Sequence, residues 1–136
     1  MRDIKFRAWD SKSKCMFTPP IVDCDGKAGH FLDNGVPMYS LYEMPVMQYT
    51  GLKDMNGVEI YEGDIVCHFN DVVFRDKKFH IERSYEINVV QFHYGMFCLS
   101  VDDELPMGLW INAKECEFEV IGNKYANPEL VPELVK

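Results

Sequence analysis

The feature that most constrains the fold is the dipeptide Asn56-Gly57, which separates two strand-like segments, residues 46–50 and 58–61. Asn-Gly between such segments is the strongest short-range signal for a β-hairpin, because both residues tolerate a positive φ. The sequence therefore predicts a hairpin at the centre of the chain.

A second turn, Glu-Gly-Asp at residues 62–64, follows directly, and apolar residues then alternate with others over residues 64–69. Alternation of this kind is the period of a strand, and glycine permits a sharp bend between strands. We therefore expect consecutive antiparallel strands over residues 46–69, with Gly57 or Gly63 at positive φ. Strands joined by such a bend are typical of a small, strongly bent β-barrel.

The β pattern extends toward both ends of the chain. Residues 4–9 alternate and residues 15–17 are apolar, which predicts an N-terminal β-hairpin. Residues 86–93 are rich in β-branched and aromatic residues with apolar groups on both faces, so they indicate a central strand or a bulge. Residues 115–121 alternate cleanly and predict a further strand.

The remaining segments have weaker patterns. Residues 20–45 and 70–85 are interrupted or charged, and we expect both to be long and irregular, with one short strand near residues 39–42. Asn127 precedes Pro128, which predicts a short C-terminal helical turn with Asn127 as its N-cap. Together these features predict a mainly β chain.

Length and apolar patterning limit the classes of protein to which the chain can belong. Its 136 residues suit a single domain over residues 1–136. No apolar run is long enough for a transmembrane helix, and no apolar stretch follows the charged N-terminus as a signal peptide requires. The five cysteines are irregularly spaced, as in reducing compartments. We therefore expect a cytoplasmic protein with no membrane partner.

The charge balance argues against nucleic-acid binding. The chain has 22 acidic and 14 basic side chains, for a net charge of −8. Phosphate backbones are bound by clustered Lys and Arg. The only basic run is Arg75-Asp76-Lys77-Lys78, whose simplest interpretation is a solvated loop.

No metal-binding or nucleophilic motif occurs. Cys67 and His68 are adjacent in a predicted strand, so they face opposite sides and cannot share an ion. His80, His93 and Cys98 could converge across a hairpin, but tetrahedral zinc requires four ligands. We expect no metal and no cofactor.

Acid–base catalysis has one candidate cluster, Glu59, Glu62 and Asp64, around a predicted turn. Turn formation explains these residues more simply, because Asp and Gly are what such a bend requires. The sequence therefore predicts that the protein is not an enzyme and has no catalytic residues. A small hydrolase using residues 62–64 is the last-ranked alternative.

Three segments, residues 4–10, 47–66 and 119–130, together resemble the YopX family of small proteins encoded by phages and prophages. They span both ends and the middle of the chain. The resemblance implies a mainly β domain with an SH3-like barrel, and it supplies no activity, catalytic residue or cofactor. The residues of these segments suit turns and a core, which favours a structural or binding module.

The leading hypothesis is therefore a non-enzymatic phage or prophage accessory protein that acts through protein–protein contacts, with itself as a homo-oligomer or with a host or phage protein. Residues 36–47 are too apolar for a solvated loop, so they pack either internally or against another chain. Aromatic and methionine side chains are enriched at interface cores, and the candidate interface is Met38, Tyr39, Tyr42 and Met44. The alternative is a nucleic-acid-binding β-barrel that uses the Arg75–Lys78 loop.

Overall fold

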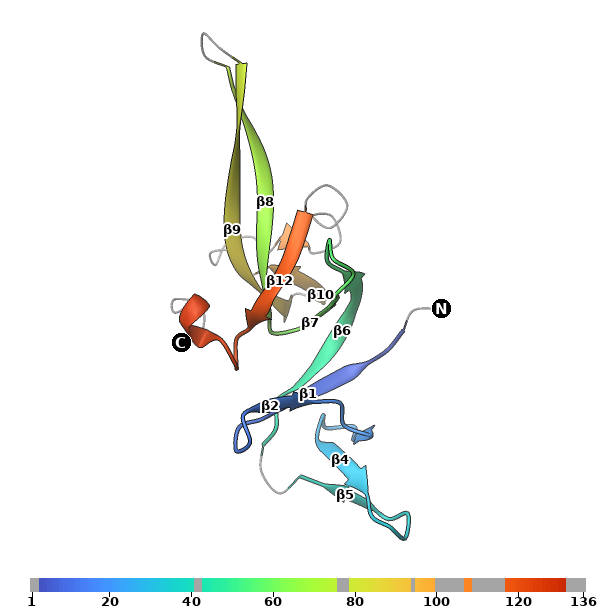
Figure 1. Cartoon of the computed structure of the whole chain (residues 1–136). Coiled ribbons are helices and arrows are strands. Elements are labelled where there is room, and N and C mark those ends of the chain that lie inside the picture. Colours follow the sequence, from blue (N-terminus) through green and yellow to red (C-terminus); the bar gives the residue numbers. More distant parts are fainter. Residues whose placement is uncertain are drawn as a thin grey trace. The chain divides into compact units, whose positions relative to one another are not determined.

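The computed structural model describes residues 3–40, 43–75, 79–93, 95–99, 107–108 and 117–131. In these ranges strands predominate, and the one helical element is the 3-10 turn η1, Pro128–Leu130 (Figure 1). The predictions of a mainly β chain and of a short C-terminal helical turn are confirmed. The chain divides into two compact units, Met1–Tyr49 and Thr50–Lys136, which are described separately.

The first unit begins with the predicted N-terminal hairpin. Strand β1, Phe6–Asp10, pairs antiparallel with β2, Cys15–Phe17. The other edge of β1 pairs antiparallel with the start of β6, Val46–Lys53. Burial of Ala8, Trp9 and Met47 at these strands places the small core of this unit along β1 and β6.

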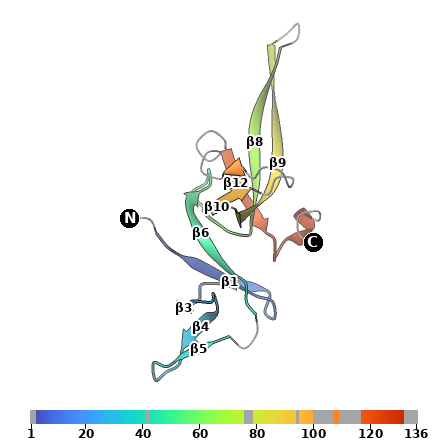
Figure 2. The same cartoon turned by 180° about the vertical axis from the view of Figure 1, so that it is seen from behind.

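A second, three-stranded antiparallel sheet completes the first unit (Figure 2). Its order is β3-β4-β5, with bounds Ile21–Val22, Ala28–Phe31 and Pro37–Tyr39. The sequence predicts an irregular segment over residues 20–45, and the structure differs from that prediction. The strands are only two to four residues long, so no periodic pattern can reveal them.

Three hairpin loops in the chain share one geometry, at residues 23–27, 32–36 and 54–58. In each loop the first residue donates its N–H to the carbonyl of the fifth, at N···O distances of 2.9, 2.9 and 2.8 Å. The fourth residue is glycine, with φ of 81°, 82° and 82°, and its N–H donates to the carbonyl of the first residue. This is the three-residue hairpin loop that ends in a left-handed glycine.

The predicted hairpin at Asn56-Gly57 is thus confirmed, with one correction. Gly57 has a positive φ, but Asn56 does not. In the described part of the chain, the one non-glycine residue with a positive φ is Lys14. Asn56 therefore occupies an ordinary turn position. Gly63 also has a positive φ, of 82°, as expected.

The second unit is built on a five-stranded sheet of order β11-β10-β9-β8-β12. Its neighbouring strands pair antiparallel. The strand bounds are β8 Asp64–Arg75, β9 Phe79–His93, β10 Met96–Leu99, β11 Met107–Gly108 and β12 Glu117–Asn123. Strand β7, Glu59–Tyr61, instead neighbours β6. Residues 46–69 therefore form consecutive strands, but the bend at Gly63 moves the chain from one sheet to another.

The core of the second unit lies on both faces of the central strands. Two successive residues of β8, Ile65 and Val66, belong to separate buried clusters, and so do Val89 and Val90 of β9. Because successive strand residues point to opposite faces, both faces of this part of the sheet are covered. The prediction of a central strand over residues 86–93 is confirmed.

Strands β8 and β9 continue beyond their neighbours as a two-stranded ribbon (Figure 1). Strand β12 pairs with β8 only as far as Phe69, whereas β8 and β9 stay paired to Arg75 and Phe79. We call the paired residues 70–75 and 79–84 the arm. The predicted irregular segment over residues 70–85 is thus largely extended strand, and residues 76–78 lie outside the described residues.

The C-terminal turn differs from its prediction in one contact. Asn127 does not cap η1 with its side chain. Its Oδ1 accepts the backbone N–H of Asn123 at 3.2 Å. The same oxygen lies 2.5 Å from the position that a Cβ would occupy if residue 122 were not glycine. The side chain is held over the bulge between Val120 and Gly122, so it cannot also face the η1 amides.

Candidate functional site

The first unit contains an apolar groove of about 580 Å³ beside the β3-β4-β5 sheet. A groove with mainly apolar lining and few polar groups is typical of a binding site. Its lining residues are Lys12, Phe17, Pro20, Ala28, Gly29, His30, Met38, Tyr39, Ser40 and Met44.

Strand pairing places the main walls of this groove. Gly29 of β4 lies opposite Tyr39 of β5, and His30 lies opposite Met38. A Cβ on Gly29 would lie 2.8 Å from Cδ1 of Tyr39 and 2.8 Å from the carbonyl oxygen of Met38. Glycine is therefore what allows the Tyr39 ring to lie against the β4 backbone.

The structure places three of the four predicted interface residues at this one groove. Met38 is 44% exposed and Tyr39 is 36% exposed, and both line the groove from β5. Met44 is half-buried and lines it as well. Tyr42 lies outside the described residues.

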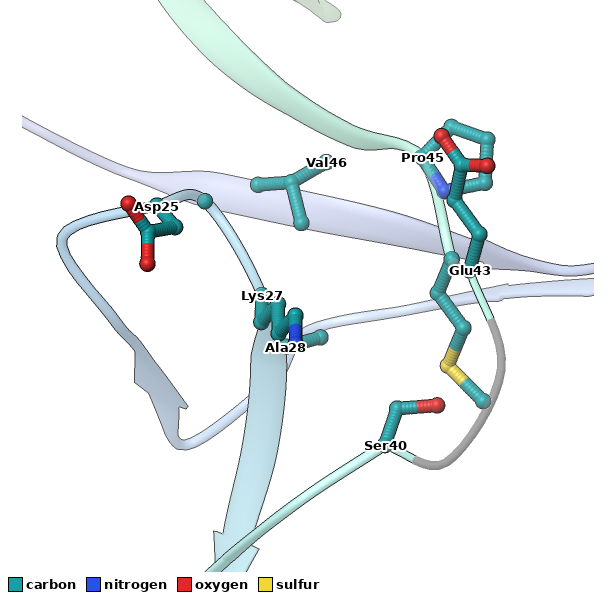
Figure 3. Close-up of a pocket in the computed structure, with 9 residues that line it drawn as sticks. Asp25, Lys27, Ala28, Ser40, Glu43, Pro45 and Val46 are labelled. Atoms are coloured by element: carbon teal, nitrogen blue, oxygen red, sulfur yellow. The ribbon is translucent and has the colours of Figure 1, made fainter.

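A polar pocket of about 460 Å³ adjoins the groove and shares Ala28, Ser40 and Met44 with it (Figure 3). Asp25 and Glu43 lie on opposite sides of this pocket, with Lys27 between them. Neither carboxylate has a hydrogen bond or ion pair within the described residues. The groove thus continues into a pocket with two available carboxylates and one ammonium group.

The edge of β5 is open among the described strands. Strand β4 pairs with β5 on one side, and β5 is the last strand of its sheet. All three residues of β5 are exposed. An open edge next to an apolar groove can bind an extended segment by strand addition.

The structure places the carboxylate candidate Asp64 and two of the cysteines in buried positions. Asp64 is buried, and its Oδ2 accepts the N–H of Tyr61 at 2.8 Å, as the bend requires. Burial raises the pKa of the Cys67 thiol and of the Cys98 thiol. Both cysteines thus have buried, protonated thiols.

His68 is the exception among the buried polar residues. It is 2% exposed, its ring stacks on Phe118 with centroids 4.8 Å apart, and neither ring nitrogen has a hydrogen-bond partner within the described residues. Burial lowers its pKa, and the nearby Glu86 carboxylate partly opposes that shift. The ring is therefore held neutral.

The remaining candidates are the residues considered for metal ligation and the basic run considered for nucleic-acid contact. Within the described residues, no three His, Cys, Asp or Glu side chains lie close enough to hold a metal ion. Of the basic run, Arg75 ends β8, and the other three residues are outside the described ranges. No helix in those ranges is both long and apolar enough to cross a membrane.

The comparison with known families gives a match over almost the whole chain. The model of the YopX protein family matches residues 5–132. This chain belongs to the YopX family. The match runs through both compact units, and the resemblance inferred from residues 4–10, 47–66 and 119–130 is confirmed.

Two solved structures share the YopX fold. Protein EF1440 from Enterococcus faecalis is 29% identical, with a TM-score of 0.58, and the alignment covers 96% of this chain and 99% of that one. Protein yopX from Bacillus subtilis is 23% identical, with a TM-score of 0.60 and the same coverage. None of the curated proteins matches this chain.

Sequence reasoning missed the side of the groove that β2 and β4 line, including Phe17, Ala28 and Gly29. The available signal was Asn34-Gly35, which is followed by valine as Asn56-Gly57 is. Treating the two dipeptides alike would have predicted the β4–β5 hairpin and, with it, the position of Met38 and Tyr39.

Proposed function

We propose that this YopX-family protein is a non-enzymatic, phage- or prophage-encoded accessory protein of the host cytoplasm. It acts through protein–protein contacts and associates with itself. The single observation that supports this best is the apolar groove on the first unit, which brings Met38, Tyr39 and Met44 together beside an open strand edge.

The chemistry of the groove suits a polypeptide ligand. Phe17, Pro20, Met38 and Met44 offer apolar surface, and methionine adapts to irregular partners. The open β5 edge offers backbone hydrogen bonds, which bind an extended chain whatever its sequence. Burying this apolar surface would stabilise the complex by about 25 cal/mol for each Å² removed from water.

A second copy of the chain is the occupant that we propose. Closed homo-oligomers are the commonest way in which soluble proteins cover open edges and apolar surface. The length of residues 36–47 and their single charged residue, Glu43, fit an interface segment better than a solvated loop.

Light scattering at micromolar concentration tests the proposal. We expect a mass above the 15.8 kDa of one chain. Tyr39→Glu with Met38→Glu should convert this species to a monomer, because two charges would enter the groove, while the circular dichroism spectrum stays unchanged. The matched control is Phe31→Glu, an exposed residue of β4 that does not line the groove and should leave the mass unchanged.

A wild-type species of 15.8 kDa that is unchanged on concentration would contradict self-association. An oligomer that survives the Met38 and Tyr39 substitutions would place its interface elsewhere and contradict the role of the groove.

A further inference from the structure

Hydrogen bonding within the β4–β5 hairpin determines which backbone groups of β5 face its open edge. The N–H of Ser40 donates to the carbonyl of Ala28 at 3.0 Å, and the N–H of Leu32 donates to the carbonyl of Val36 at 2.9 Å. In an antiparallel ladder, hydrogen-bonded pairs alternate with pairs that are not hydrogen-bonded. The backbone groups of every second residue therefore point toward β4, and those of the residues between them point away from it.

Pro37 and Tyr39 are the two residues of β5 whose backbone groups point to the open edge. They lie opposite Phe31 and Gly29, one residue out of step with the hydrogen-bonded pairs. Proline has no N–H, so Tyr39 is the residue of β5 that offers both a donor and an acceptor at this edge. Neither of these two groups has a hydrogen-bond partner within the described residues. The edge therefore fits a strand that presents a donor and an acceptor at one residue.

The side chain of Tyr39 leaves this edge accessible. A Cβ on Gly29 would lie 2.8 Å from Cδ1 of Tyr39, so the ring leans toward β4 and away from the open edge. Met38 projects from the opposite face of the sheet, because successive strand residues point to opposite faces. An incoming strand can therefore reach the backbone of Tyr39 without displacing its ring.

The charges beside this edge suit a second copy of the chain. Two chains with a net charge of −8 each repel one another. The groove and the polar pocket contribute nothing to this repulsion, because their charged lining residues, Lys12, Lys27, Asp25 and Glu43, carry two charges of each sign. Since each copy presents both signs here, a second copy supplies charges complementary to those of the first.

We propose that β5 of one copy pairs antiparallel with β5 of a second copy across a two-fold axis at Tyr39. This inference rests on the self-association proposed above and identifies the strand and the register that mediate it. A two-fold axis brings the same surface of both copies together. With Tyr39 opposite itself, each Tyr39 N–H donates to the Tyr39 carbonyl of the other copy, so the open donor and acceptor of both copies are satisfied.

The missing N–H of Pro37 selects this register over its neighbour. An axis at Met38 would place Tyr39 opposite Pro37 of the second copy and leave the Tyr39 carbonyl without a donor. An axis at Tyr39 joins the two three-stranded sheets into one continuous sheet. It also places the two tyrosines as a cross-strand aromatic pair and Met38 of both copies on one face of that sheet.

Disulfide cross-linking between two different variants tests the register. In the proposed register, Met38 lies opposite Ser40 of the second copy, in a pair that is not hydrogen-bonded, where side chains approach most closely. A mixture of Met38→Cys and Ser40→Cys should therefore form a covalent dimer on mild oxidation, with twice the mass of one chain. Peptide mass spectrometry should find the disulfide between positions 38 and 40.

Each cysteine variant alone is a matched control. Two residues at position 38, or two at position 40, are diagonal neighbours across the axis, with Cα atoms about 7–8 Å apart, too far for a disulfide. Met38→Cys alone and Ser40→Cys alone should therefore stay monomeric under denaturing conditions. Phe31→Cys, at an exposed residue of β4, should cross-link with neither variant.

The native cysteines are removed where they could react. Cys15 and Cys24 are exposed, whereas Cys67 and Cys98 are buried. All variants therefore also carry Cys15→Ser, Cys24→Ser and Cys116→Ser, so the engineered positions supply the reactive thiols.

The outcomes separate this inference from the proposed function. Cross-linking of Met38→Cys alone would place the axis at Met38 and overturn the proposed register. If the mixture does not cross-link, although Tyr39→Glu with Met38→Glu dissociates a wild-type oligomer, then the groove binds a second copy without β5 pairing at Tyr39. A wild-type chain that remains at 15.8 kDa under all conditions overturns both proposals.

Discussion

At the scale of single residues, glycine is required where the hairpin loops close. Gly57 has a φ of 82°, and a Cβ added there would meet no atom within 4 Å. The constraint at this position is therefore the backbone conformation and not the available space. The same holds for Gly26 and Gly35 in the loops of the first unit.

Replacing Gly57 with valine should lower the free energy of unfolding by more than about 1 kcal/mol, because a β-branched residue is strained at positive φ. Gly57→Asn should cost less, since asparagine tolerates the left-handed region. Urea denaturation monitored by circular dichroism measures both. Equal effects of valine and asparagine would contradict the backbone explanation.

His68 is a second residue whose environment has a measurable consequence. Burial holds its folded-state pKa below the value of about 6.5 in an unfolded chain. As the pH falls through that value, the unfolded state takes up a proton more readily than the folded state does. The folded state should therefore lose stability on acidification, with the loss beginning near pH 6.5.

The comparison of wild type with His68→Leu isolates this contribution. Between about pH 7.5 and about pH 5.5, the urea midpoint of the wild type should fall more than that of His68→Leu. His30→Gln, at an exposed histidine, is the control and should follow the wild type. Parallel curves for wild type and His68→Leu would show that His68 protonation does not affect unfolding.

At the scale of elements, one side chain joins the β6–β7 hairpin to β12. Asp54 is 8% exposed, and its Oδ1 accepts the N–H groups of Asn56 and Val58, each at 2.8 Å. Its Oδ2 accepts the N–H of Val120, 66 residues away, at 2.9 Å. The carboxylate thus shapes the loop and holds it against a strand from the other end of the chain.

Asp54→Ala should lower the free energy of unfolding by more than about 2 kcal/mol, because it leaves three part-buried N–H groups without their acceptor. The matched control is Asp23→Ala. Asp23 makes the same loop bonds to Asp25 and Lys27 at 2.9 and 2.7 Å but is exposed enough for water to replace them. A loss at Asp54 no larger than at Asp23 would show that the contact with β12 contributes little.

At the scale of the whole molecule, the net charge limits which classes of partner the chain can bind. A net charge of −8 repels polyphosphates, and the only basic run belongs to the arm and its connection. We therefore expect no salt-sensitive binding to duplex DNA at physiological ionic strength.

Fluorescence anisotropy with a labelled duplex at low and moderate salt measures this directly. The control is the variant with Arg75→Glu, Lys77→Glu and Lys78→Glu, which should show no binding, like the wild type. A sub-micromolar complex that weakens steeply with salt, and that Arg75→Glu, Lys77→Glu and Lys78→Glu abolish, would support the nucleic-acid alternative instead.

The accuracy of sequence-based prediction follows from the range of the interactions concerned. The hairpin at Gly57, the bend at Gly63 and the N-terminal hairpin were all predictable because each depends on a few neighbouring residues. The burial of both Val89 and Val90 was predictable because apolar residues on both faces of one strand indicate a central position. The family could be inferred because its motifs contain these same local features.

The groove and the arm depend on strand pairings in segments that are too short or too polar to show a strand period, and the local signal for the β4–β5 hairpin, Asn34-Gly35, is a turn dipeptide. Strands β3 and β5 have two and three residues, and their positions follow from pairing with β4. The arm contains charged residues and shows no strand period in its sequence. Its strand structure comes from the backbone pairing of β8 with β9. Asn127 was predicted to cap a helix, but its side chain accepts the N–H of Asn123 and lies against Gly122 instead.

The sequence by itself thus determined the strand-rich class, the turns at Gly57 and Gly63 and membership of the YopX family, since these follow from local backbone preference and periodicity. Only the tertiary structure decided that Met38, Tyr39 and Met44 share one groove, that Asp54 reaches β12, and that residues 70–75 and 79–84 pair as an arm. The physical reasons are two: Asp54 and Val120 are 66 residues apart in the sequence, and the groove and the arm depend on strand pairing in segments that show no strand period.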